Sequence, residues 1–453
     1  MLSYREALRA IFSRTDYERQ GQPPYPERVW RLSRMEELLE QLGDPHRAFR
    51  SIHIAGTKGK GSTTAMIESV LRCAGYRTGM YTSPHLHTFR ERICFSGELI
   101  PEQDVVRLVE RLLPILDVRP EVTVFEIITA LAMLYLAEQR VDFGVFEVGM
   151  GGRLDATNVL RPLVSIITSI SLDHINVLGD TLAAIAGEKA GIIKAGIPVI
   201  TSPQQADAMQ VIRATCAERG ATLTIVGQDW QWRFLGADLD GQDLAIYRVG
   251  HEEKPEYPRL RIPLLGAHQL ENASSAVAAI EALREQGITI PREVVQPGLA
   301  AVRWPGRMEI LSQEPSLVLD GAHNAYSVQR LLEALPEYLQ YRRLLVIFGA
   351  GVTHNAVEML ALLAPAASAL YVTRSHHAKA TPVAELQTLA RSLGREALPS
   401  STVRESLQRA LGDAREGDLI LVTGSLFVAG EAREAWAEFN NLPPFATDPP
   451  GVY

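Results

Sequence analysis

Residues 56–62 combine glycine, lysine and hydroxyl side chains at spacings that suit the binding of a phosphate group. Residues 52–55 before them, three of which are apolar, predict a short buried strand, and the residues after them predict the start of a helix. Backbone N–H groups of such a turn face an anion, and Lys60 adds a positive charge. The spacing differs from a strict Walker A loop, because only two residues separate the first two glycines and a third glycine follows Lys60. The segment therefore predicts a nucleotide site with a variant phosphate loop.

Two other predicted strands end in residues that suit a cation site. Glu147 ends the apolar run 143–148 and precedes a glycine-rich turn, which is where a magnesium-binding carboxylate is expected in a parallel sheet. The alternative is an acid that only faces solvent. Asp173 and His174 follow the run 164–169 and should reach the same sheet edge. Such a pair alone is more typical of a cap or a hydrogen bond, because magnesium prefers oxygen ligands.

Lys189 lies in an apolar stretch bounded by glycines. A lysine on a helix is most often a surface residue, but this local sequence predicts partial burial and a lowered pKa. If the side chain is buried, its amine differs chemically from that of an ordinary surface lysine.

The second half of the chain repeats the arrangement of a strand followed by a polar turn. Asp320 follows an apolar run and precedes a glycine, so it suits a ribose or a phosphate-bound metal, or else it caps a turn. Arg307 lies at a predicted hinge, where it could clamp a phosphate or form an interdomain salt bridge. His376 and His377 follow another strand, where they could contact substrate, but a solvated loop is the expected position.

Apolar strands that alternate with helices predict an α/β fold: an N-terminal P-loop domain with a parallel sheet and a small antiparallel piece, and a second Rossmann-like α/β domain. Residues 3–45 are expected to be helical around a loop at 20–26, residues 221–262 to be antiparallel, and a helix to follow at 272–286. The predicted domains are 1–295 and 306–453, with a proline-rich linker at about 291–305. The expected strands are 51–55, 78–81, 143–148, 164–169, 198–201, 317–319, 344–348, 369–373 and 419–422, and the remaining helices 63–74, 102–113, 125–138 and 182–190.

The composition excludes several classes of protein. The chain has 453 residues, enough for two or three domains, and a net charge of −8 without a basic block, which argues against nucleic-acid binding. Its three cysteines form no CxxC pair, so a disulfide framework or a structural zinc site is not expected. No apolar run is long enough to cross a membrane, and the first residues do not follow a signal-peptide pattern. The composition predicts a soluble cytoplasmic protein.

Taken together, the motifs resemble those of the folylpolyglutamate synthase and dihydrofolate synthase family, within the Mur-ligase-like enzymes. The matching segments occur in the order of the family and cover most of residues 50–325. They are HIAGTKGKGST, YTSPHLHTFRERI, FEIITALAMLYL, FEVGMGGRLDATNV, SISLDHINVLGDTLAAIAGEKAGIIK, HQLENASSAVAAI, RWPGRMEIL and LDGAHN. One departure lies in the loop, where many bacterial members have asparagine in place of Lys58.

The resemblance implies ATP-dependent ligation of L-glutamate to a folate carboxylate through an acyl phosphate. A carboxylate is a poor electrophile until a phosphate makes one of its oxygens a leaving group. Dihydrofolate synthesis from dihydropteroate in the same site remains open, as do two other functions. A cell-wall Mur ligase would normally have an additional N-terminal domain, whereas only about fifty residues precede this loop. A regulatory P-loop NTPase is disfavoured by the second α/β domain. A monomer is expected.

The resemblance also implies roles for individual residues. Lys60, His174 and Lys189 are the expected catalytic residues, and Lys189 is expected to carry a carbamate that holds the second of two Mg²⁺ ions. The first Mg²⁺ is expected at Ser83, Glu147 and His174. ATP is expected to contact Thr57, Lys58, Gly59, Lys60, Gly61, Ser62, Asn272, Arg307, Asp320 and His323. The folate is expected to contact Pro84, His85, Thr123, Phe125, Glu126, Leu154, Asp155 and Ala156.

Overall fold

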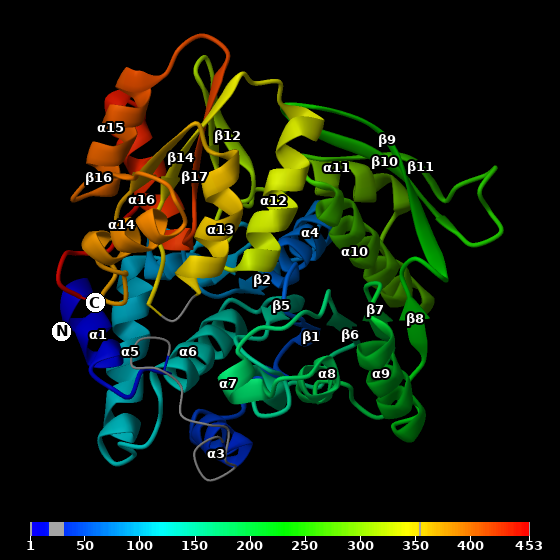
Figure 1. Ribbon diagram of the computed structural model, residues 1–453. Helices are drawn as coiled ribbons and strands as arrows, with labels where there is room; N and C mark the ends of the chain where they lie inside the picture. Colours follow the sequence, from blue (N-terminus) through cyan, green and yellow to red (C-terminus); the bar gives the residue numbers. More distant parts are fainter. Residues whose placement is uncertain (1, 18–30, 353–354, 453) are drawn as a thin grey trace.

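The computed structural model describes residues 2–17, 31–352 and 355–452, and two separate sheets organise them (Figure 1). The predicted loop at 20–26 lies outside the described residues. The first sheet has eight strands in the order β4-β3-β2-β5-β1-β6-β7-β8. All neighbours from β2 to β8 are parallel, and β3 and β4 add an antiparallel edge. Its strands are β1 Arg50–Ala55, β2 Thr78–Tyr81, β3 Ile93–Phe95, β4 Glu98–Leu99, β5 Phe143–Glu147, β6 Val164–Ile167, β7 Val199–Thr201 and β8 Leu223–Ile225.

Helices cover both faces of the first sheet, and successive residues of its central strands point to opposite faces. On β5, Val145 packs with residues of α4 and α10, whereas the neighbouring Phe146 packs with residues of α5 and α6. Burial on both faces explains why these strands are apolar throughout rather than alternating. The helices are α1 Tyr4–Phe12, α3 Leu32–Gln41, α4 Lys60–Cys73, α5 Glu102–Asp117, α6 Val124–Glu138, α7 Ile175–Leu178, α8 Leu182–Ala190, α9 Ala206–Glu218 and α10 Ala267–Glu285.

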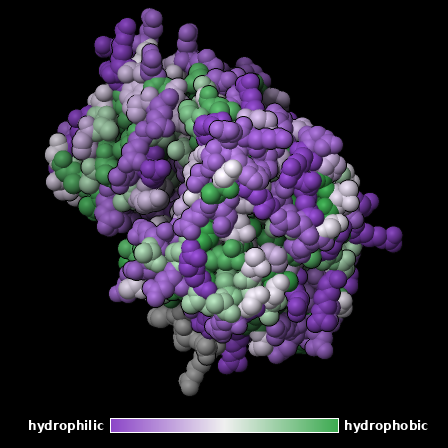
Figure 2. All heavy atoms as spheres, turned by 90° about the vertical axis from the view of Figure 1, so that its right-hand side faces the viewer, coloured by the Kyte–Doolittle hydropathy of each residue, from purple (hydrophilic) through white to green (hydrophobic). Residues whose placement is uncertain are grey.

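A three-stranded antiparallel sheet, β9 Trp230–Asp238, β10 Gly241–Arg248 and β11 Tyr257–Ile262, packs beside α10. Figure 2 shows the face that lies at the right of Figure 1, where hydrophilic side chains predominate and hydrophobic ones are interspersed. Residues 291–305 include η4 Arg292–Val294 and α11 Val295–Ala300. Gly298 of α11 packs against the backbone of Val70 in α4. The division into domains 1–295 and 306–453 stays a prediction.

The second sheet has the order β12-β13-β17-β14-β15-β16, in which only β12 is antiparallel to its neighbour. Residues of α12, α13 and α14 pack on one face and residues of α15 and α16 on the other. The strands are β12 Glu309–Gln313, β13 Ser316–Leu319, β14 Arg343–Phe348, β15 Ala369–Val372, β16 Leu398–Pro399 and β17 Asp418–Thr423. The helices are α12 Ala325–Tyr338, α13 Ala356–Ala366, α14 Val383–Ser392, α15 Val403–Asp413 and α16 Leu426–Phe439.

The predicted fold class is confirmed, with two local corrections. Residues 221–262 are not all antiparallel, because β8 extends the parallel sheet before the antiparallel strands begin. The helix predicted at 272–286 begins earlier, at Ala267. Among the described residues, no helix combines the length and the apolar character that crossing a membrane requires.

His53 is a fully buried histidine in β1, beneath the phosphate loop. Its Nε2 lies 2.8 Å from the hydroxyl of Thr157, which itself donates to Asp155. Thr157 therefore accepts from Nε2–H, and the imidazole is neutral. Burial lowers the pKa of His53 to about 3.

Replacing His53 by glutamine is expected to make the free energy of unfolding less sensitive to acid. Between pH 6.5 and 3 the unfolded chain protonates His53 and the folded chain does not, so this histidine costs stability as the pH falls. At about 1.4 kcal/mol per pKa unit, the full loss is on the order of 5 kcal/mol. Urea unfolding at several pH values measures the slope, with the exposed His251→Gln as the control. Equal slopes in wild type and His53→Gln would contradict the assignment.

Candidate active site

The phosphate loop connects the end of β1 to the start of α4. The backbone N–H groups of Thr57 and Lys58 donate to the carbonyl of Ser169, at 2.9 and 3.2 Å, which fixes the loop to the segment after β6. Gly56 and Gly59 have φ angles of 148° and 90°. A Cβ at Gly56 would collide with Thr168, and one at Gly59 would collide with the side-chain oxygen of Asn272. The loop is thus a tight turn that needs glycine at both positions.

Lys60 and Glu147 face each other at the edge of the sheet where β5 ends. The Lys60 ammonium lies 3.8 Å from one carboxylate oxygen of Glu147, and the backbone N–H of Ser83 donates to the other at 3.2 Å. Glu147 is buried, and burial raises its pKa while Lys60 opposes that rise. The two oxygens of this buried side chain therefore face the Lys60 ammonium and the backbone of Ser83.

The residues expected to hold magnesium fit that ion in part. Ser83, Glu147 and His174 all line one cavity, and the hydroxyl and carboxylate are the hard oxygen ligands that Mg²⁺ prefers. Desolvation by the surrounding protein lowers the pKa of His174, which leaves its imidazole neutral and able to act as a ligand. Among the described residues, no three His, Cys, Asp or Glu side chains form a ready-made metal cluster. Phosphate oxygens or waters would have to complete the coordination.

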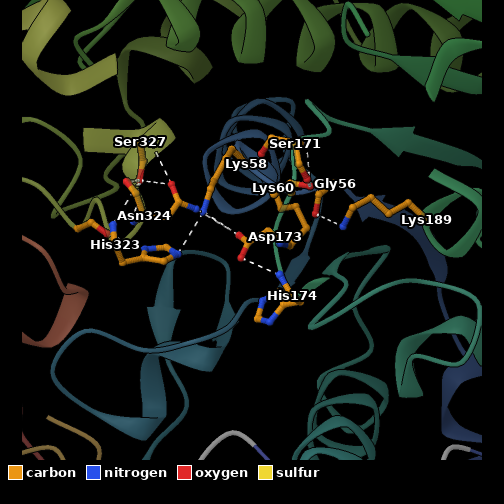
Figure 3. A network of polar contacts seen from close by, with 12 residues as sticks. Gly56, Lys58, Lys60, Ser171, Asp173, His174, Lys189, His323, Asn324 and Ser327 are labelled. Carbon is orange, nitrogen blue, oxygen red and sulfur yellow. Dashed lines mark hydrogen bonds and ion pairs between the residues drawn. The ribbon is translucent and has the colours of Figure 1, made fainter. Parts of the chain in front are cut away.

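Lys189 is buried at the end of α8, as the sequence predicted, and its side chain points toward the phosphate loop. Its ammonium donates to the carbonyl oxygen of Gly56 at 2.9 Å, behind the loop (Figure 3). Burial, and next the like charge of Lys60, lowers the pKa of Lys189 to about 7. A substantial fraction of this amine is therefore neutral and nucleophilic at physiological pH.

Lys58 extends away from the loop and contacts the other half of the protein (Figure 3). Its ammonium lies 3.0 Å from Asp173 Oδ2 and 3.1 Å from His323 Nε2. Burial alone would raise the pKa of Asp173, but the Lys58 ammonium beside it holds that pKa well below its usual range. The Asp173 side chain is therefore a carboxylate paired with Lys58. Sequence reasoning missed this role, because nothing local links residue 173 to residue 58.

The other residues expected around ATP come from α10 and from the start of the second sheet. Asp320 accepts from the backbone N–H groups of Met308 and Ala322, at 2.8 and 2.7 Å, and burial raises its pKa. Arg307 donates to the carbonyl of Gly306 at 2.9 Å. Trp304, another residue that the sequence analysis missed, packs directly over Gly61.

A cavity of about 920 Å³ joins these groups to the residues expected around the folate. Every predicted site residue lines it except Lys189, which lies behind the loop. Polar groups among the residues expected around the folate already have protein partners. Arg34 donates to both oxygens of Glu126, at 2.7 and 2.9 Å, and His85 accepts from Arg92 at 3.0 Å. Pro84, Phe125, Leu154 and Ala156 add apolar side chains to this wall of the cavity.

The pair His376 and His377 is only partly as predicted. His376 is exposed, in agreement with a solvated loop. The ring of His377, however, stacks on Phe427 with centroids 4.2 Å apart. His377 thus lies in a loop, as expected, but it is half-buried there, because its ring stacks on a helix about fifty residues further along the chain. Both histidines line the cavity, and the alternative of a substrate contact stays a prediction.

Comparison with known proteins matches two families to most of the chain. The Mur ligase middle domain matches residues 54–280, and the glutamate ligase domain of Mur ligases matches residues 306–426. The dihydrofolate synthase/folylpolyglutamate synthase of Bacillus subtilis is 37% identical over 411 residues, which are 89% of this chain and 94% of that protein.

Two further relatives agree with these matches. A probable bifunctional folylpolyglutamate synthase/dihydropteroate synthase of Haloferax volcanii is 36% identical over 96% of this chain, which spans only 51% of that longer protein. The structure of Mycobacterium tuberculosis folylpolyglutamate synthase complexed with ADP has a TM-score of 0.86 and 30% identity. The similarity covers 98% of this chain and all of that one.

Proposed function

The chain belongs to the folylpolyglutamate synthase and dihydrofolate synthase family of Mur ligases, and from this we propose that it is an ATP-dependent ligase that joins L-glutamate to a folate carboxylate. The observation that carries this function is the single cavity in which the phosphate loop, Glu147 and the apolar folate wall meet. The nucleotide and the acceptor carboxylate can thus be bound side by side.

In the proposed reaction, the folate carboxylate attacks the γ-phosphate of ATP and forms an acyl phosphate with release of ADP. The amine of glutamate then attacks the acyl carbon, phosphate leaves, and an amide forms. The residues of this chain act mainly by positioning and by charge stabilisation. The backbone N–H groups of residues 59–62 and the Lys60 ammonium hold the phosphates, while Phe125 and its apolar neighbours orient the ring. Arg307, Asp320 and His323 are proposed to contact ATP from the opposite side.

Magnesium is proposed to bind beside Lys60, with Ser83, Glu147 and His174 among its ligands. When bound, the ion would neutralise the negative charge that develops on the phosphates of the leaving group. The buried Glu147 carboxylate supports this site, because its ion pair with Lys60 spans the long distance of 3.8 Å.

Lys189 is proposed to be carbamylated. Its neutral amine would attack CO₂, forming an N–C bond and releasing one proton, and the product has a carboxylate end. The lowered pKa and the buried position beside Lys60 support this modification, because a carbamate replaces a repelling cation with an anion. That anion is proposed to help hold a second Mg²⁺.

An assay with purified protein tests this function. The protein is incubated with ATP, Mg²⁺ and L-glutamate, and tetrahydrofolate or dihydropteroate is the acceptor in parallel reactions. Glutamate-dependent ADP release and a product with one added glutamate are expected with tetrahydrofolate. Product with dihydropteroate as well would show dihydrofolate synthase activity, which the paired name of the Bacillus subtilis relative suggests. ATP hydrolysis that ignores glutamate would instead favour an NTPase.

The same assay tests the alternative acceptors. If neither folate accepts glutamate, another carboxylate acceptor of the Mur-ligase type becomes the better candidate. A monomeric state, a cytoplasmic location and the domain boundaries stay predictions.

A further inference from the structure

Lys58 joins two parts of the chain that are distant in sequence. It lies in the phosphate loop, whereas Asp173 follows β6 of the first sheet and His323 follows β13 of the second sheet. The ammonium contacts both, at 3.0 Å and 3.1 Å (Figure 3). We call these three side chains the Lys58 bridge. It links the phosphate loop directly to the second sheet.

The protonation states of the Lys58 bridge are mutually consistent. His323 Nδ1 lies 2.9 Å from the carbonyl oxygen of Gly321, so Nδ1–H donates to that oxygen and Nε2 accepts from Lys58. Asp173 Oδ2 accepts from the same ammonium. Without the ammonium, the acceptor atoms Asp173 Oδ2 and His323 Nε2 would face each other. The hydrogen bonds that connect the two sheets at this point would be lost, and the two lone pairs would repel each other.

The bridge also reaches the helix that follows His323. Asn324 Nδ2 lies 3.5 Å from Asp173 Oδ2, and Asn324 Oδ1 accepts from the backbone N–H of Ser327 in the first turn of α12. The contact thus connects the loop to the beginning of α12. The first turns of α12 line the cavity, so a contact at this point can set the distance between the cavity wall formed by the second sheet and the wall formed by the phosphate loop.

The two lysines of the loop have different partners. Lys60 faces Glu147 within the first sheet, whereas Lys58 faces the second sheet. Only Lys60 is thus directed to the end of β5, where the phosphate and its cation are proposed to bind. Lys58 already has an anionic partner of its own.

We propose that Lys58 is a positioning residue that holds the second sheet against the phosphate loop and so sets the geometry of the closed active site. The proposal rests on the proposed function, because it concerns the distance between the nucleotide and the residues that meet it from the opposite wall. A displacement of about 1 Å between reacting groups can cost on the order of a hundredfold in rate. Loss of the bridge should therefore affect turnover more than nucleotide affinity.

The test compares Lys58→Met with Lys194→Met. Lys194 is a matched control, because it is also a partly buried lysine with a hydrogen bond, 2.7 Å to the carbonyl of Asn158, and it does not line the cavity. In Lys58→Met, kcat is expected to fall at least about tenfold, while the Kd for a non-hydrolysable ATP analogue, measured by calorimetry, changes less than about threefold. Lys194→Met should change neither. If the Kd weakens as much as kcat falls, or if kcat is unchanged, the proposal is overturned.

A second measurement does not depend on catalysis. Small-angle scattering of the analogue-bound protein should give a larger radius of gyration for Lys58→Met than for wild type, and an equal radius would contradict the bridge. Asp173→Asn should behave similarly, and the double variant should be no worse than either single variant. Additive losses would show that the two residues act separately and would overturn the proposal. If the wild-type protein transfers no glutamate, the proposed function is refuted. The scattering comparison would still test the bridge in that case.

Discussion

Replacing Lys60 by alanine is expected to reduce ATP-dependent glutamate incorporation by at least about a hundredfold. Lys60 begins α4, and its ammonium is the only lysine charge of the loop that faces Glu147, 3.8 Å away. Phosphoryl transfer depends on charge stabilisation rather than on covalent chemistry by the protein, so the loss of this charge raises the barrier directly. The helix itself should persist, because alanine favours helix formation.

The measurement is radiolabelled glutamate incorporation, with circular dichroism and urea unfolding to verify the fold. Lys254→Ala, in an exposed turn, is the control for the loss of a lysine charge remote from the cavity. The control should keep wild-type activity. Turnover in Lys60→Ala that stays near the wild-type rate would contradict its assignment to the phosphates.

Local sequence patterns predicted most of the elements that carry the site. The strand, glycine turn and helix at 50–73 follow from an apolar run, from glycines and from the helical pattern after them. The same reasoning located β5 with Glu147 at its end. These features depend on residues close in sequence, which is why they were predictable. The two-residue strands β4 and β16 are too short to produce a pattern.

Contacts between distant segments were not predictable in the same way. The pairing of Lys58 with Asp173 and His323 depends on how the two sheets pack, and no local pattern encodes that packing. The sequence between 221 and 229 resembles the antiparallel piece that follows it, because its segments are short and polar. In the structure β8 is the edge strand of the parallel sheet, where an exposed side tolerates polar residues.

The environment of Lys189 was predictable in part, because its burial follows from a local pattern and its hydrogen-bond partner does not. Its apolar neighbours predicted burial, and the structure confirms it. The partner of its ammonium, the carbonyl of Gly56, is more than a hundred residues away and belongs to the phosphate loop itself. The lysine thus contacts the backbone of the loop, so its chemical state bears on the phosphate site.

Replacing Lys189 by alanine is expected to lower activity by at least about a hundredfold, and short carboxylic acids such as acetate should restore part of it. The alanine leaves space behind Gly56, and a small carboxylate there would replace the negative end of the proposed carbamate. Lys194→Ala, at a lysine outside the cavity, is the control and should be neither impaired nor stimulated by acetate. Activity is measured as glutamate incorporation at several acetate concentrations.

The proposed carbamate also leads to an expectation for the wild-type protein that does not depend on the acetate experiment. Because the pKa of Lys189 is lowered to about 7, its amine becomes neutral as the pH rises through that value, and only the neutral amine reacts with CO₂. Preincubation with bicarbonate should therefore stimulate CO₂-depleted enzyme more at pH 8 than at pH 6, and Lys189→Ala should not respond at either pH. Intact-mass measurement of fully active protein that shows an unmodified Lys189 would refute the carbamate, and a rescue by acetate would then need another explanation. If the modification is present, the amine behind the phosphate loop becomes a carboxylate, and Lys60 remains the positive charge directed at the phosphates.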